Sequence, residues 1–384
     1  MILGIRMKKA LTLLLALFFL TTSCVIMAKP ALSAAGEAED TWSAKAPMQE
    51  ARGRLGVAAV NGKIYAIGGG AGGIVGPILG PYRYGGTGLI RNTTEEYDPE
   101  IDKWAFKAPL PTPREHFGIT VYENKIYCIG GDTKNGETGV NEVYDPATDM
   151  WETKTPMPVP TRFPTSNVVD GKIYLIGTRY SGHSLNQVYD PETCTWASKT
   201  PPPTQIGSGA SAVFDNKIYS INIDGFVQIY DPANDSWSTG AKAPSTEAPG
   251  QIYPLDTATA AVTSGVYAPK RIYFFGEAGT YVYDPANDSW TVGEAIPTAR
   301  GFAGAAVIND TIYVVGGVIF QYSGGYMGPT AVNEQYTPIG YETAPPTNPT
   351  WLVYATAASA SAIAVSAGLI VYFKKRRRQT SPQT

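Results

Sequence analysis

The sequence predicts an all-β protein whose central region is a six-bladed β-propeller. Short strand signals recur about every 40–50 residues between Trp42 and Pro338, which is the period of four-stranded propeller blades. The chain of 384 residues also contains 41 Gly, 30 Pro and 24 Tyr but only 16% charged residues. This composition is typical of a turn-rich β protein and argues against a helical bundle or a coiled coil.

The first 35 residues are expected to form a secretory signal peptide. A basic pair at Lys8-Lys9 precedes an apolar run over residues 10–20, and small residues follow toward Ala35. This order of segments indicates export, and the apolar run is too short to span a bilayer. Cys24 leaves a lipidated N-terminus open as an alternative, although the three residues before it fit a bacterial lipobox poorly.

One repeated element is a strand that begins with Lys-Ile-Tyr, or a variant of it, and often ends in a Gly pair. It occurs six times, as KIYAIGG at Lys63, KIYCIGG at Lys125, KIYLIG at Lys172, KIYSIN at Lys217, RIYFFG at Arg271 and TIYVVGG at Thr311. In five repeats an apolar stretch and a tight-turn pair, such as Asn61-Gly62, come just before it. These two strands are therefore predicted to form a hairpin.

The second repeated element is Tyr-Asp-Pro followed within seven residues by Trp. It occurs five times, at Tyr97 and Trp104, Tyr144 and Trp151, Tyr189 and Trp196, Tyr230 and Trp237, and Tyr283 and Trp290. Asp-Pro ends the third strand of each unit because it starts a turn, and the Trp opens the fourth strand. We expect the Tyr and Trp side chains to pack between blades.

The two ends of the repeat region are expected to close the ring. Residues 39–42, Glu-Asp-Thr-Trp, resemble the Asn-Asp-Ser-Trp that opens the fourth strand at Trp237 and Trp290, yet no first three strands precede them. The last repeat has three strand signals that end at Thr337-Pro338, and it has no Trp. The strand at Trp42 is therefore predicted to be the outermost strand of the sixth blade, which removes two free sheet edges.

The repeats resemble the kelch repeat. The Gly pair, the Tyr that follows it and the spaced Trp form the kelch signature, and six units over residues 42–338 give about 50 residues per blade. Blades three, four and five depart from the signature, with Gly177-Thr178, Ile221-Asn222 and Gly276-Glu277 in place of the Gly pair. The resemblance implies a six-bladed kelch propeller over residues 36–338.

The C-terminal region is predicted to anchor the chain in a membrane. Residues 351–373 contain no charged residue and are long enough to span a hydrocarbon core of about 30 Å. A basic tail, residues 374–384, follows at once, which places the tail in the cytoplasm and the propeller outside. Residues 339–350 are rich in Pro and Thr and are typical of a short, stiff stalk.

Ligand binding is expected on the face of the propeller whose connections vary in length, because loops on a rigid scaffold carry binding. Two long loops, residues 68–94 and 318–331, leave this face from blades one and six, which ring closure makes neighbours. They contain four candidate ligand-binding residues, Tyr82, Tyr84, Tyr322 and Tyr326. The alternative is that the aromatic residues of these loops only cover blade edges.

Arginine precedes the innermost strand in blades one, two, three and six. The candidates are Arg54 (or Arg52), Arg114, Arg162 and Arg300. An inward arc of guanidinium groups suits a carboxylate, which Arg binds bidentately. The kelch resemblance also implies contact with acidic ligands at this position. The alternative is that these arginines bond to loop carbonyls and to acidic residues between blades.

No catalytic set, metal site or cofactor is predicted. The sequence has two His, His116 and His183, and three Cys, which are too few for a histidine-built metal site or a disulfide scaffold. Galactose oxidase, on a related fold, needs a copper site with a Tyr cross-linked to Cys, and Cys128 and Cys194 are expected far from the channel mouth. All 33 acidic residues lie between the two basic ends, so nucleic acid is not expected as a partner.

Two functions therefore stay open. The first is a non-enzymatic, membrane-anchored module that binds an extracellular protein or a glycan through the long-loop face. The alternative is an exported mutarotase acting on acidic sugars, because some exported six-bladed kelch propellers are sialic-acid mutarotases. That activity would use the arginine arc together with Glu115 or His116.

Overall fold

Strands form the regular secondary structure of the part of the chain that the computed structural model describes, and no helix occurs there. The described residues are 38–71, 89–178, 184–222, 224–244, 257–276, 279–319 and 328–342. The chain divides into two compact units, Met1–Ala38 and Glu39–Thr384, and every strand belongs to the second. The predicted signal peptide, membrane segment and basic tail lie outside the described residues, and so does the predicted stalk from residue 343 onward.

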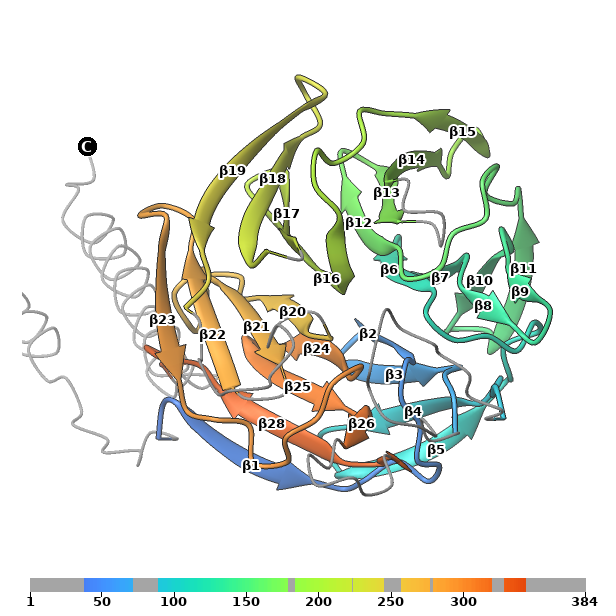
Figure 1. The fold of residues 1–384 in the computed structure, drawn as a ribbon. Coiled ribbons are helices and arrows are strands. Elements are labelled where there is room, and N and C mark those ends of the chain that lie inside the picture. The colour runs from blue at the N-terminus through green and yellow to red at the C-terminus, as the bar shows by residue number, and fades with distance from the viewer. Residues whose placement is uncertain are drawn as a thin grey trace, which may run out of the picture. The chain divides into compact units, whose positions relative to one another are not determined.

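Six four-stranded antiparallel sheets surround a central axis as the blades of a propeller, as predicted (Figure 1). Blades one to three consist of β2 (Gly56–Val60), β3 (Lys63–Ile67), β4 (Thr94–Asp98) and β5 (Lys103–Lys107); β6 (Gly118–Tyr122), β7 (Lys125–Ile129), β10 (Asn141–Asp145) and β11 (Met150–Lys154); and β12 (Thr165–Val169), β13 (Lys172–Thr178), β14 (Ser184–Asp190) and β15 (Thr195–Ser198). Blades four to six consist of β16 (Ile206–Phe214), β17 (Lys217–Asn222), β18 (Phe226–Asp231) and β19 (Ser236–Lys242); β20 (Thr259–Val262), β21 (Ile272–Gly276), β22 (Gly279–Asp284) and β23 (Ser289–Gly293); and β24 (Gly304–Ile308), β25 (Thr311–Val315), β28 (Asn333–Thr337) and β1 (Thr41–Lys45).

The ring closes through the N-terminal strand, which confirms the prediction from Trp42. β1 pairs antiparallel with β28, and Trp42 lies opposite Tyr336. In Figure 1 the blue β1 therefore runs along the red β28, although 296 positions of sequence separate Asp40 from Tyr336. The hydroxyl of Tyr336 donates to Asp40 Oδ1 at 2.7 Å, and the indole of Trp42 donates to the carbonyl of Glu294 at 3.0 Å.

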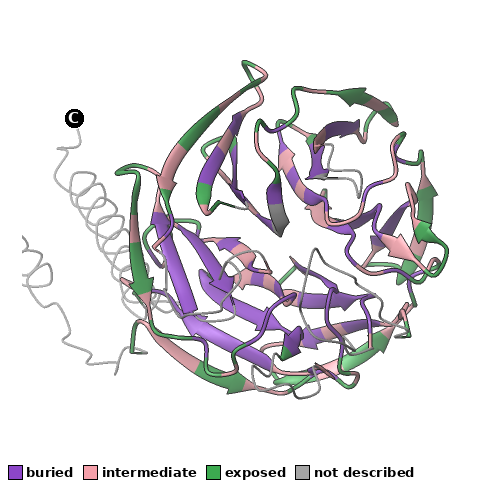
Figure 2. Ribbon diagram, in the orientation of Figure 1, coloured by how far each residue is buried: buried purple, intermediate pink, exposed green. Residues whose placement is uncertain are grey.

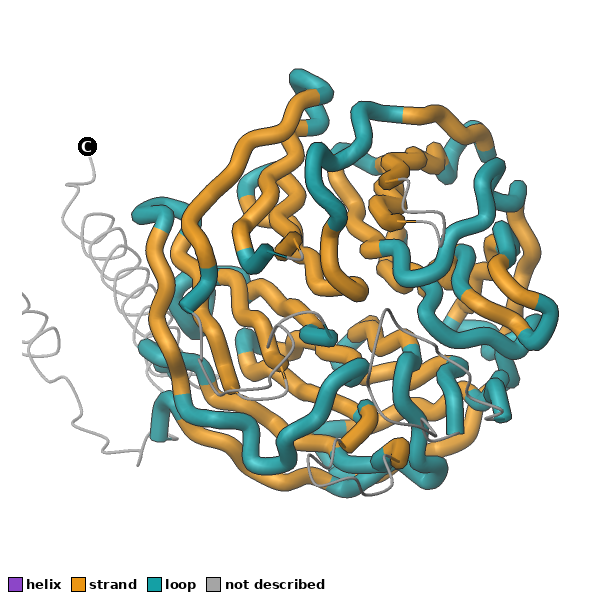
Figure 3. Tube along the Cα trace, viewed as in Figure 1, coloured by secondary structure: helices purple, strands orange, loops and turns teal. Residues whose placement is uncertain are grey.

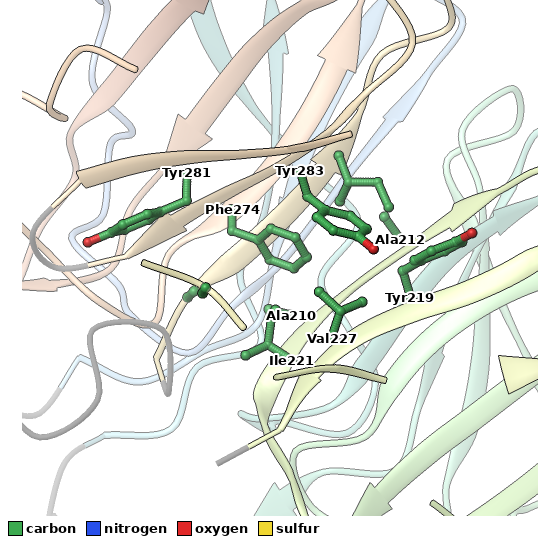
Figure 4. Packing of buried hydrophobic residues seen from close by; sticks show 11 residues of the cluster. Ala210, Ala212, Tyr219, Ile221, Val227, Phe274, Tyr281 and Tyr283 are labelled. Carbon is green, nitrogen blue, oxygen red and sulfur yellow. The ribbon is translucent and has the colours of Figure 1, made fainter. Parts of the chain in front are cut away.

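The hydrophobic core consists of six clusters, one between each pair of neighbouring blades. Figure 4 shows the cluster between blades four and five, where Phe274 and Tyr283 point toward Ile221 and Val227. Burial falls from the inner strands to the outermost ones, whose outward side chains are exposed (Figure 2). Burying apolar area at every blade junction is what holds the ring together.

The Tyr and Trp of each repeat pack at these junctions, as predicted. The six tyrosines are between 0% and 1% exposed, and each lies 5.0 Å from its Trp between ring centroids; the pairs are Tyr97 and Trp104, Tyr144 and Trp151, Tyr189 and Trp196, Tyr230 and Trp237, Tyr283 and Trp290, and Tyr336 and Trp42. Tilted aromatic pairs of this kind stabilise beyond their burial alone. This motif is therefore structural.

The connections between second and third strands carry two further small hairpins. β8 (Asp132–Thr133) pairs with β9 (Gly136–Glu137) in blade two, and β26 (Val318–Ile319) pairs with β27 (Gly328–Pro329) in blade six. In Figure 3 these strands stand among the loops of the blades. Both hairpins lie beside the segments that enter the innermost strands, because Glu115 bridges to Asp132 and Gly301 bridges to Val318.

Candidate ligand site at the mouth of the central cavity

Four residues occupy the same repeat position, just before the innermost strand of their blade. They are Arg54, His116, Phe163 and Phe302, and their φ angles are 59°, 55°, 51° and 54°. Non-glycine residues seldom adopt this left-handed backbone, and bulky ones least of all. The innermost strands of blades two and six accordingly start at Gly118 and Gly304, two residues after His116 and Phe302.

A belt of backbone hydrogen bonds holds these residues in place. The N–H of Phe163 donates to His116 O at 2.8 Å, that of His116 to Arg54 O at 3.0 Å, and that of Arg54 to Phe302 O at 2.9 Å. The N–H of Phe302 donates in turn to Thr257 O at 2.9 Å. The belt thus links blades five, six, one, two and three, and satisfied backbone groups offset the cost of the left-handed conformation.

The Gly pairs hold the belt against the blades. The N–H of Gly131 donates to Thr161 O at 3.0 Å, across the junction with blade three. A Cβ on Gly131, whose φ is 94°, would lie 2.6 Å from the carbonyl oxygen of Glu115. Glycine is required there both for its backbone conformation and for this close approach.

A cavity of about 160 Å³ opens inside the belt, and the segments of all six blades contribute to its lining. Arg54, His116, Phe163 and Phe302 line it at the entry to the innermost strands. Side chains further along those strands are both apolar, such as Ile119 of blade two, and hydroxyl-bearing, such as Ser166 and Ser211. The cavity is thus a concave site that offers polar groups beside the rings of Phe163 and Phe302.

Charged groups gather at one side of this cavity. Arg54 Nη1 lies 3.5 Å from Glu115 Oε2. His116 Nδ1 lies 3.8 Å from Glu115 Oε1 and 3.6 Å from Asp132 Oδ2. Arg54 and His116 are each 8% exposed. Water therefore screens the electrostatic interactions of their side chains only partly.

The imidazole of His116 is enclosed by aromatic rings. Its centroid lies 3.7 Å from that of Phe163 and 5.8 Å from that of Phe302. This burial lowers the pKa of His116 below its ordinary value, and the neighbouring Asp132 opposes the effect in part. The ring is therefore neutral at pH 7.

The structure separates the four arginines proposed from the sequence. Arg114 and Arg300 lie inside their blades, 0% and 1% exposed. Arg114 forms an ion pair with Glu142, and its Nη2 donates to Cys128 O at 2.8 Å. Arg300 pairs in the same way with Glu334 on β28. These two guanidinium groups bond to groups within their own blades and do not line the cavity.

Arg52, the alternative to Arg54, occupies the same position as Arg114 and Arg300. It is 0% exposed, and its Nη2 lies 2.9 Å from Glu95 Oε1 on β4. Its Nη1 donates to the carbonyls of Gly68 and Thr93, each at 2.8 Å. Of the two candidates in blade one, Arg54 is therefore the one that faces the cavity.

Arg162 lies at the edge of the site, at a third repeat position. Its side chain is 19% exposed, its Nε lies 3.9 Å from Glu137 Oε1, and its Cζ lies 5.5 Å from the ring centroid of Phe163. Arg162 does not line the cavity in the described structure. Its guanidinium instead borders the cavity residue Phe163.

The stems of the two long loops lie side by side at this face, whereas their tips are outside the described residues. Gly53 bridges to Gly70, and the N–H of Gly317 donates to Arg52 O at 2.9 Å. The stems of loops 68–94 and 318–331 thus flank one segment of blade one. The four candidate tyrosines, Tyr82, Tyr84, Tyr322 and Tyr326, lie outside the described residues.

Sequence reasoning did not assign a binding role to Phe163 and Phe302. One signal in the sequence would have found them: Arg52, Arg114 and Arg300 each precede a cavity residue by two positions. The same spacing from Thr161 leads to Phe163.

Within the described ranges, no group of three His, Cys, Asp or Glu residues could hold a metal ion. The described part of the chain also has no helix long and apolar enough to cross a membrane.

Two stretches of the chain, residues 51–111 and 113–158, match the kelch motif. The protein thus carries kelch motifs in a six-bladed β-propeller. The solved structure of YjhT has a similar fold, with a TM-score of 0.57 and 13% sequence identity, covering 75% of this chain and 96% of YjhT.

Curated relatives share only part of the chain. The influenza virus NS1A-binding protein homolog of Mus musculus is 40% identical over 85 residues, which is 22% of this chain and 11% of that protein. Kelch domain-containing protein 7A of Mus musculus is 32% identical over 97 residues, 24% of this chain and 10% of that protein. The chain therefore matches about a tenth of the length of these relatives.

Proposed function

We propose that this protein is a non-enzymatic binding module that holds a carboxylate group of a protein or glycan at the mouth of its cavity. One observation carries the proposal: Arg54 is buried at the cavity but incompletely paired. Among the described residues its only ion pair is the 3.5 Å contact with Glu115, and its Nε has no hydrogen-bond partner. Arg52 also has no partner at Nε, but both of its terminal nitrogens are bonded, Nη1 to the carbonyls of Gly68 and Thr93 and Nη2 to Glu95 at 2.9 Å.

A buried, incompletely paired guanidinium favours an anionic partner. Arg presents a planar set of donors that matches a carboxylate, and such charge-assisted bonds are among the stronger ones in proteins. The rings of Phe163 and Phe302 add an apolar surface beside it, with Arg54 Cζ 5.7 Å from the ring centroid of Phe302. Kelch propellers typically bind proteins, and one relative is named for binding the protein NS1A.

We further propose that the mouth is presented outside the cell. The predicted signal peptide, residues 1–35, and the predicted membrane helix, residues 351–373, support this location. The position of the C-terminal end of the propeller relative to the cavity mouth is consistent with this location. Glu342 N donates to Tyr267 O at 2.7 Å, in the loop after β20, whereas the cavity lies at the start of that strand. The chain thus leaves the propeller at the end of the blades opposite the mouth.

The alternative, a mutarotase for acidic sugars, has one observation in its favour. Glu115 and His116, which can exchange protons, flank the proposed carboxylate anchor Arg54. Mutarotation needs such general acid and base groups. Exchange between the anomers of sialic acid, measured by NMR with and without the protein, distinguishes the two functions. Binding without faster exchange supports the module, and faster exchange that is lost in Glu115→Gln supports the enzyme.

Thermal unfolding of the purified full-length chain tests the binding site. The probes are sialic acid, glucuronic acid and a triglutamate peptide, with galactose as the neutral comparison. An acidic probe at 100 times its dissociation constant should add about 2.7 kcal/mol of stability. Arg54→Gln should abolish this shift. Arg271→Gln, which removes the same charge at the opposite end of blade five, should keep it. Equal shifts in both variants, or no shift with any acidic probe, would overturn the proposal.

A further inference from the structure

A carboxylate of the protein itself lies beside the cavity residue Arg54. Glu115 Oε2 lies 3.5 Å from Arg54 Nη1 and packs against the backbone of Gly70, where a Cβ would come within 2.2 Å of it. Two backbone hydrogen bonds with Asp132, of 3.0 and 2.8 Å, fix the backbone of Glu115. Its side chain is 18% exposed, whereas that of Glu95, the partner of Arg52, is 0% exposed. Glu115 thus already pairs with the guanidinium that a bound carboxylate would contact.

The imidazole of His116 lies next to Glu115 and is close to two carboxylates. The Nδ1 atom of His116 is within 4 Å of both Glu115 Oε1 and Asp132 Oδ2. Glu115 therefore has two possible cationic neighbours: Arg54, which is always charged, and His116, which is charged only when it is protonated. In the structure its two oxygens lie toward the two groups, Oε2 toward Arg54 and Oε1 toward His116.

The other charged groups near His116 belong to the segments that precede three innermost strands. Arg54 lies on the segment before β2, and its charge opposes protonation of the imidazole. On the segment before β12, Arg162 lies near Glu137. On the segment before β24, Arg300 is buried with Glu334 inside the blade. Glu115 and Asp132 are therefore the carboxylates available to a charged His116 in the described structure.

We propose that protons control this site: neutral His116 leaves Glu115 on Arg54, and protonated His116 draws Glu115 away and opens Arg54 to an anionic ligand. The proposal rests on the binding function proposed above for the same residues. Glu115 acts as an internal competitor of the ligand, and His116 is a positioning residue that acts through it. Protonation also adds a second positive charge beside the bound anion.

The direction of the pH dependence follows from linkage. Burial lowers the pKa of His116, so the free protein carries a neutral ring at pH 7. An anion on Arg54 favours the charged ring, so binding takes up a proton and affinity must rise as the pH falls. A rise of one unit in the pKa of His116 on binding corresponds to a tenfold gain in affinity.

The experiment uses the full-length chain and sialic acid as the probe, whose carboxylate stays ionised between pH 5.5 and 7.5. Titration calorimetry should give about tenfold tighter binding at pH 5.5 than at pH 7.5. His116→Asn should remove most of this dependence, because Asn tolerates the left-handed backbone but does not titrate. Glu115→Gln should bind more tightly than the parent at pH 7.5, since the competitor is gone.

A second readout needs no ligand. The chain has only two histidines, so His183→Gln leaves the Hε1 resonance of His116 alone in the NMR spectrum. Its midpoint should fall in Glu115→Gln, which removes a neighbouring negative charge. An unchanged midpoint overturns the inference, as does binding that is independent of pH or equally dependent in His116→Asn. Absence of sialic acid binding at both pH values, with no binding of triglutamate, overturns the proposed function as well.

Discussion

At the scale of single residues, a hydrogen-bonded chain of Tyr, Asp and backbone couples neighbouring blades. Tyr144 OH donates to Asp149 Oδ1 at 2.6 Å, and that oxygen also accepts the N–H of Ala108 from the preceding blade at 2.9 Å. The Tyr hydroxyl holds the pKa of Asp149 below its usual range, so the carboxylate stays charged. Equivalent Tyr–Asp bonds occur at Tyr97 and Asp102, Tyr230 and Asp235, Tyr283 and Asp288, and Tyr336 and Asp40.

Blade three departs from this pattern and offers a test of it. Cys194 takes the place of the aspartate, with a φ of 56°, and its Sγ contacts Pro191 O at 3.7 Å. Cys194→Asp should restore the bonds to the Tyr189 hydroxyl and to the backbone N–H of Thr155. We expect the free energy of unfolding to rise by about 1 kcal/mol. Urea denaturation at pH 7 measures this change.

The gain should depend on pH in a defined direction. The unfolded carboxyl has a pKa of about 3.9, and the hydrogen bonds should lower the folded value, as they do for Asp149. The added stability is then present above pH 4 and is lost as the pH falls through the folded value. Cys194→Asn is the control, because Asn shares the backbone preference without the charge. Equal stability of the Asp and Asn variants at pH 7 would contradict this account.

At the scale of elements, buried Arg–Glu pairs tie the entry segment of a blade to its third strand. Blades one, two and six carry them, and blade three has Thr161 and Gln187 at the same two positions. Gln187 bonds instead to the backbone of Val159, at 3.0 and 2.9 Å. At these two positions a blade therefore has either both charged residues or neither, because a buried charge without a partner is costly.

Removing one member of a pair should be costly. Arg114→Thr leaves Glu142 buried without its cation and should lower the free energy of unfolding by about 3–5 kcal/mol. Arg114→Thr combined with Glu142→Gln copies blade three and should recover part of that loss. Arg162→Thr, at a more exposed arginine, is the control. Urea denaturation of the three variants measures their free energies of unfolding. A decrease below about 1 kcal/mol for Arg114→Thr alone would show that the ion pair is not needed for stability.

The sequence predicted the strands well and the arginines poorly, for one physical reason. Strands follow from local patterns, such as a tight turn before Lys-Ile-Tyr and Asp-Pro before Trp, which act within a few residues. Arg52 and Arg54 precede the same strand two positions apart. The left-handed backbone at Arg54 decides which one enters the blade and which one faces the cavity, and it depends on the belt bonds to other blades.

At the scale of the whole molecule, the β1–β28 pairing and the belt close one ring. The pairing is predictable because Trp42 stands alone at one end and the last repeat lacks its Trp. Deleting residues 40–47 should expose the edge of β28 and remove the Trp42 and Asp40 contacts. We expect the truncated chain to lose its cooperative thermal transition in calorimetry. A truncated chain that melts like the parent would contradict closure as the source of stability.

The central claim is that Arg54 anchors an anionic ligand at the cavity mouth, and a comparison of dissociation constants tests it most directly. The acidic probe that stabilises the full-length chain most is titrated into the parent, Arg54→Gln and Arg271→Gln. A hydrogen bond to a charged group contributes about 1.5–3 kcal/mol, so binding to Arg54→Gln should weaken at least about tenfold while Arg271→Gln matches the parent. The same dissociation constant for Arg54→Gln and the parent would contradict the claim.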